Sequence, residues 1–157
     1  IQKLLQRKLN KKYSKFIFGI DFDNTIVNYD DEFKNLFKKK YFFNSKNLNT
    51  KRNIKNYIIK KIGITEWKKF QSEIYSNHIK KAYPNIEILK LLKFLDKNKI
   101  KFYIVSHKTI YPYTGAKIDL HKISKKWIKN NIFNKENNFR NKYKYFFETT
   151  EKKKIKR

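Results

Sequence analysis

Cysteine and methionine are absent from this 157-residue sequence, and glycine and proline are scarce, with three and two residues. Without cysteine, a disulfide framework and a thiolate metal site are both excluded. No apolar run approaches the roughly 20 residues that cross a bilayer, and the N-terminus lacks the uninterrupted apolar stretch of a signal peptide. We therefore expect a cytoplasmic protein that has no membrane partner. The 39% of apolar residues are enough to fill the core of one domain.

The net charge is +27, with 40 Lys and Arg against 13 Asp and Glu. Such a chain attracts polyanions, above all nucleic acid. However, the lysines are spread along the whole chain, and the abundant residue types (Lys, Asn, Ile, Phe and Tyr) all have A/T-rich codons. A low-GC genome would produce this profile without selection for a ligand. We expect non-specific nucleic-acid binding at low salt, and the sequence leaves open whether the charge is functional. It also leaves the oligomeric state open.

Three apolar segments predict the strands of a sheet. They lie at Phe16–Ile20, Ile100–Val105 and Tyr145–Phe147. The first is continuous, as expected of a buried parallel strand. Apolar residues at helical spacing predict helices between the strands. The first helix begins near residue 30, the others cover 64–74, 86–95 and 120–131, and residues 44–53 are expected to form a loop. A further helix is expected to begin after Thr150. The alternation indicates an α/β fold with a parallel sheet and right-handed crossovers.

Two aspartates, Asp21 and Asp23, follow the first strand directly. Residues two apart on a strand project to the same side, and open parallel sheets bind ligands beyond the carboxyl ends of their strands. Two carboxylates there repel each other unless a cation or a proton intervenes. Mg²⁺, which prefers oxygen ligands, is the natural cation, and it brings an anionic phosphate with it. The alternative is a capped strand end with solvated aspartates.

The segment Asp21-Phe-Asp23-Asn-Thr25 resembles the first motif of the haloacid-dehalogenase-like superfamily, Asp-x-Asp-x-Thr after an apolar strand. The segment Phe102-Tyr-Ile-Val-Ser106 matches the second motif, an apolar strand that ends in Ser or Thr. The third motif is a Lys early in a later helix. Lys152, Lys153 and Lys154 are its candidates, and we favour Lys154. The run Ser106-His-Lys-Thr also resembles a little-characterised bacterial subgroup of the superfamily.

The resemblance implies a Rossmann-like three-layer parallel sheet with a helical cap insertion. It divides the chain into a basic arm (1–15), a core (16–29 and 84–157) and a cap (30–83). It further implies a fourth, acidic motif that nothing after Lys154 supplies. From this, and from the missing Met, we expect a piece of a longer reading frame that binds Mg²⁺ weakly and has an open sheet edge beside the first strand.

For function, the resemblance implies a Mg²⁺-dependent phosphatase that hydrolyses a small phosphate monoester. Asp21 would form an aspartyl-phosphate, and Asp23 would act as general acid and base. Thr25 would order the turn. Ser106 and Lys154 would bind the phosphoryl group, and Asp21 and Asp23 would hold the Mg²⁺. The alternatives are a phosphatase acting on nucleotides or nucleic-acid ends, and a non-catalytic binding module.

The remaining polar residues carry weaker signals. His107, Lys108 and Tyr113 lie in or beside the loop after the second motif, where substrate should arrive, and they are candidates for a substrate-contacting loop. His78 is expected to be solvated on a basic helix. The three histidines are too dispersed to predict a zinc site. Trp67 and Trp127 fall on apolar helical faces and are expected in the core.

Overall fold

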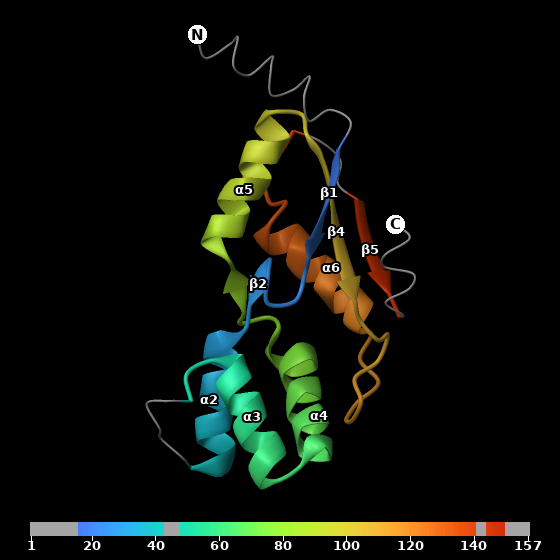
Figure 1. Ribbon diagram of the computed structural model, residues 1–157. Coiled ribbons are helices and arrows are strands. Elements are labelled where there is room, and N and C mark those ends of the chain that lie inside the picture. Colours follow the sequence, from blue (N-terminus) through green and yellow to red (C-terminus); the bar gives the residue numbers. More distant parts are fainter. Residues whose placement is uncertain (1–15, 43–47, 141–143, 150–157) are drawn as a thin grey trace. The chain divides into compact units, whose positions relative to one another are not determined.

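The computed structural model describes residues 16–42, 48–140 and 144–149. The chain forms two compact units (Figure 1). One unit comprises the described parts of Ile1–Val27, Pro84–Lys108 and Ile128–Arg157, and the other comprises Asn28–Tyr83 and Thr109–Trp127. The sequence-based division assigns 84–157 to one core, whereas the structure groups residues 109–127 with the helical unit. The two-residue strands β2 (Val27–Asn28) and β3 (Tyr83–Pro84) pair where the chain passes between the units.

The first unit is built on a three-stranded parallel sheet. Its strands are β1 (Ile17–Asp21), β4 (Lys101–His107) and β5 (Lys144–Glu148), in the order β1-β4-β5. Ile104 in the middle strand pairs with Ile20 on one side and Tyr145 on the other. This arrangement confirms the predicted α/β class with a parallel sheet.

Helix α5 (Ile86–Lys97) leads into the middle strand. The Asn85 side chain caps its first turn by accepting a hydrogen bond from the Glu87 N–H. Leu92 and Leu95 are buried, and the helix contacts β4. A later helix, α6 (Leu120–Asn131), precedes β5 and begins in the segment that belongs to the other unit.

Strand β1 differs from the sequence-based prediction in its burial. The apolar run predicts a buried strand, yet Phe16, Ile17 and Phe18 are 57%, 53% and 40% exposed. The reason is its position, because β1 is an edge strand whose only neighbour among the described residues is β4. An edge strand keeps apolar side chains open to solvent unless another element covers them.

The second unit is helical. It contains α2 (Asp30–Tyr41), α3 (Lys51–Lys61), α4 (Ile64–Glu73) and the π-helical turn η1 (Ile74–His78). Its core is aromatic. The ring of Phe33 stacks on Trp67 at 5.6 Å and contacts Phe70 at 6.0 Å, and all three side chains are buried. Trp127 is buried as predicted, and its indole N–H donates to the Ala82 carbonyl.

Helix α3 corrects the sequence analysis, which predicts a loop through residue 53. The helix begins at Lys51, and the Thr50 side chain caps it by accepting a hydrogen bond from the Asn53 N–H. Ile54 and Ile58, four residues apart, form its buried face. Two apolar residues at this spacing in a Lys-rich segment are a weak periodic signal. Within the described ranges, no helix combines the length and apolar character needed to cross a membrane.

Candidate functional site

The candidate site lies at the carboxyl end of β1. Asp21 is the last residue of the strand and pairs in register with Val105 of β4. The next residue, Phe22, is fully buried, and its N–H donates to the Val105 carbonyl at 3.2 Å. Asp23 follows and forms an isolated bridge with Val27. The ladder with β4 therefore extends one residue past the strand, to Phe22, and the bridge to Val27 holds the backbone of Asp23.

A tight turn follows the aspartates. The Phe22 carbonyl accepts hydrogen bonds from the N–H groups of Ile26 and Val27, both at 3.1 Å. Asn24 adopts a left-handed conformation with φ of 59°, which asparagine tolerates better than most residues. Thr25 is half-buried within this turn. The turn reverses the chain and keeps Asp23 beside the end of the sheet.

Two donors, one in β4 and one just beyond its end, hold the Asp23 carboxylate. The Ser106 hydroxyl donates to Asp23 Oδ2 at 3.2 Å, and Lys108 Nζ donates to Oδ1 at 2.9 Å. Ser106 is almost fully buried. The side chains of Lys108 and Asp23 are only 3% and 13% exposed, so this ion pair is shielded from solvent. The structure thus brings Asp23 and Ser106 together and adds a lysine to them.

Lys108 is fixed from several directions. Its ammonium lies 5.6 Å from the centre of the Phe22 ring, and its backbone N–H donates to the Glu148 carbonyl at 3.0 Å. The sequence analysis places Lys108 in a substrate loop and does not foresee its pairing with Asp23. The available signal is its position two residues after Ser106, just beyond the end of a parallel strand. That signal is hard to recognise among so many lysines.

The other predicted site residues lie elsewhere. His107 is exposed, and its Nε2 lies 3.0 Å from the Thr149 carbonyl oxygen. Tyr113 belongs to the helical unit, where its backbone N–H donates to Ser72 Oγ and Lys68 Nζ lies 4.9 Å from its ring centre. Lys154 and its alternatives Lys152 and Lys153 lie outside the described residues, as does the helix predicted after Thr150.

The fit of a metal ion depends on the oxygen atoms of Asp21 and Asp23. Both oxygens of the Asp23 side chain already accept hydrogen bonds, from Ser106 and Lys108. In the described part of the chain, no three or more His, Asp and Glu residues gather closely enough to hold a metal. Mg²⁺ commonly takes one or two carboxylates and completes its shell with water and substrate phosphate. The Asp21 carboxylate and the Asp23 backbone carbonyl are donors of this hard type.

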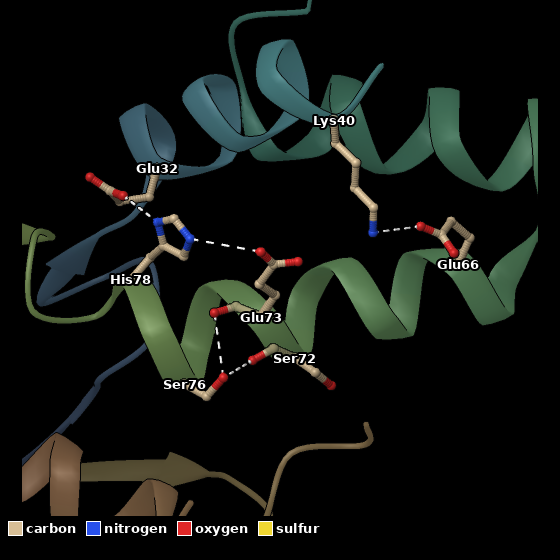
Figure 2. A network of polar contacts seen from close by, with 7 residues as sticks. All are labelled: Glu32, Lys40, Glu66, Ser72, Glu73, Ser76 and His78. Carbon is tan, nitrogen blue, oxygen red and sulfur yellow. Dashed lines mark hydrogen bonds and ion pairs between the residues drawn. The ribbon is translucent and has the colours of Figure 1, made fainter. Parts of the chain in front are cut away.

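The helical unit contains a second polar cluster, shown in Figure 2. His78 Nδ1 lies 2.9 Å from Glu32 Oε2, and its Nε2 lies 4.0 Å from Glu73 Oε1. Contrary to the sequence analysis, His78 is therefore not simply solvated, and its side chain is 23% exposed. The π-helical turn that ends at His78 supplies this contact, and Ser76 in the same turn donates to the Ser72 carbonyl at 2.7 Å. Turns of this kind are frequent at functional sites.

Other members of this cluster tie α2 to α4. Lys40 Nζ and the Tyr41 hydroxyl both lie 2.9 Å from Glu66 Oε1. The hydrogen bond from Lys40 is the main reason why the pKa of Glu66 lies below its ordinary value. Burial, together with the hydrogen bond to Glu66, raises the pKa of Tyr41. These contacts stabilise the packing of α2 against α4, and we assign them no catalytic role.

Replacing His78 by Ala should destabilise the helical unit by about 1–3 kcal/mol, because the largely buried Glu32 carboxylate loses its charged or hydrogen-bonded partner. Urea denaturation followed by far-ultraviolet circular dichroism measures this change. Lys90→Ala is the matched control, since its pair with Glu87 is exposed on both sides and should contribute less than about 1 kcal/mol. Equal effects of the two substitutions would show that the Glu32–His78 contact does not stabilise the fold.

In comparisons with known proteins, no family model matches the chain, and neither a curated protein nor a solved structure matches it.

Proposed function

We propose that the protein is a phosphatase of the haloacid-dehalogenase-like kind, which hydrolyses a phosphate monoester through an aspartyl-phosphate on Asp21. One observation carries the proposal. Asp21 ends a parallel strand, Asp23 follows two residues later, and Ser106, near the end of the neighbouring strand, donates a hydrogen bond to Asp23. In open parallel sheets this edge is where ligands bind. The motif residues from two distant parts of the sequence therefore meet at the expected edge.

The chemistry assigns one role to each aspartate. The Asp21 carboxylate attacks phosphorus, and the bond from phosphorus to the leaving oxygen breaks as the new bond forms. The leaving oxygen takes a proton from Asp23, which then accepts a proton from the water that hydrolyses the aspartyl-phosphate. The proton count of the enzyme is restored after each cycle. The contacts of Asp23 with Ser106 and Lys108 restrict the position of its carboxylate.

A divalent cation fits this scheme through the Asp21 carboxylate and the backbone carbonyl of Asp23. When bound, Mg²⁺ would offset the negative charge of the phosphoryl group. Ser106 and Lys154 are proposed to bind the phosphoryl oxygens, and Thr25 is proposed to hold the turn after Asp23. The helical unit is the candidate cap, which would exclude water and select the substrate.

The charge of +27 favours a second candidate, a phosphatase that acts on nucleotides or on nucleic-acid ends. A functional basic surface would give sequence-independent binding with a steep salt dependence near physiological salt. Binding that disappears well below physiological salt would instead agree with a compositional origin of the charge. A non-catalytic binding module is the third alternative.

Phosphate release from a panel of sugar phosphates, nucleotides and p-nitrophenyl phosphate tests the function. We expect release that requires Mg²⁺ and stops when a chelator is added. The assay uses the 157-residue chain. Release that is unaffected by a chelator would contradict the proposed metal dependence. Absence of release from every monoester would favour a binding module.

A further inference from the structure

Lys108 places a positive charge inside the candidate site. Its ammonium contacts Asp23 at 2.9 Å, and its side chain is 3% exposed. At a solvated surface such a pair would be screened and weak. Where solvent is excluded, the effective dielectric is lower and the attraction between the two charges is stronger. The pair is therefore an electrostatic component of the site as well as a structural contact.

The position of Lys108 is set by the sheet. Its N–H donates to the Glu148 carbonyl of β5, and its ammonium lies near the face of the Phe22 ring. Phe22, which lies between the two aspartates in the sequence, is fully buried. The backbone and the path of the side chain are thus both constrained, so that the charge remains beside Asp23. A mobile loop lysine would not satisfy these contacts together.

We propose that Lys108 is a built-in counter-ion of the Asp21–Asp23 pair, which lets the site fold without a metal and lowers its affinity for Mg²⁺. The proposal rests on the proposed function, because it takes the two aspartates as the metal-binding edge. Lys108 offsets one negative charge of this edge through its contact with Asp23, and its removal would take that positive charge away. An ammonium beside Asp23 also repels a divalent cation that binds at Asp21 and at the Asp23 carbonyl. Lys108 thus positions the Asp23 carboxylate, and its charge acts on the metal ion.

The test is Mg²⁺ binding to the metal-free protein, measured by isothermal titration calorimetry. We expect Lys108→Met to bind Mg²⁺ roughly tenfold or more tightly than the wild type, because a unit charge a few ångström from a divalent cation is worth at least a decade of affinity near a protein surface. Lys108→Arg keeps the charge and should bind like the wild type. Lys90→Met, which removes an exposed lysine, should also bind like the wild type.

If Lys108→Met does not fold in the absence of metal, circular dichroism replaces calorimetry. The proposal then predicts that millimolar MgCl₂ restores the fold, and failure to restore it would overturn the proposal. Unchanged or weaker Mg²⁺ binding by a folded Lys108→Met would also overturn it. In that case, Mg²⁺-dependent phosphate release by the wild type would leave the proposed function standing. If no variant binds Mg²⁺ and no chelator affects release, the counter-ion proposal and the proposed metal dependence both fail.

Discussion

Asp21→Asn should reduce phosphate release by about 10³-fold or more, since loss of a covalent nucleophile removes the pathway through the intermediate. The amide has nearly the shape of the carboxylate, and Asp21 is a half-exposed residue at a strand end. We therefore expect the fold to be retained, as judged by circular dichroism. The rate should be measured under substrate saturation with Mg²⁺ present, so that kcat is compared directly.

Two further variants make this result specific. Asp23→Asn should lower kcat by about 10²–10⁴-fold, the usual contribution of a general acid and base, while still allowing some intermediate to form with substrates that have good leaving groups. Asp31→Asn is the control, because Asp31 is an exposed residue in the first turn of α2 that pairs with Lys34. It should leave the rate unchanged. An Asp21→Asn variant that retains activity within tenfold of the wild type would exclude Asp21 as the nucleophile.

Lys108→Met should lower the free energy of unfolding by about 3–5 kcal/mol in the absence of metal, because it leaves the Asp23 carboxylate buried without its charged partner. The double variant Asp23→Asn/Lys108→Met removes both charges and should recover much of this loss. The two residues are in direct contact, so a double-mutant cycle should show strong coupling. Chemical denaturation of the four proteins measures it.

The exposed Lys90–Glu87 pair provides the comparison for this cycle. Its side chains are 67% and 72% exposed, and its coupling energy should stay below about 1 kcal/mol. The buried position of the Lys108–Asp23 pair is the physical reason for the difference. Additive effects of Asp23→Asn and Lys108→Met would mean that the contact between these two residues contributes little to stability.

The proximity of Asp23 and Ser106 could be predicted because the sequence signals for the ends of the two strands are local. A continuous apolar run followed by Asp21-Phe-Asp23 indicates a strand end, and Ser106 occupies the equivalent position after the next strand. Parallel pairing then requires the two ends to meet at one edge, and the contact between Ser106 and Asp23 follows from that pairing. The α/β class could be predicted for the same reason, from the alternation of strands and helices.

What could not be predicted depends on tertiary contacts. Burial of a strand's side chains requires other elements packed over its faces, and an apolar run such as Phe16–Ile20 does not reveal where the strand lies in the sheet or what covers it. The burial of Lys108 depends on Phe22 and β5, which are distant from it in sequence. His78 is similar, because its contact with Glu32 spans two helices. A chain with 40 Lys and Arg residues gives no composition signal that distinguishes one lysine from the others.

The covalent intermediate is the central claim, and trapping it is the most direct test. Protein mixed with Mg²⁺ and a phosphate monoester is treated with borohydride, which reduces an aspartyl-phosphate to homoserine, and the peptides are then analysed by mass spectrometry. The account predicts homoserine at position 21, none at position 23 and none in Asp21→Asn. Modification of a different residue, or steady release of phosphate with no acyl-phosphate on any carboxylate, would contradict it.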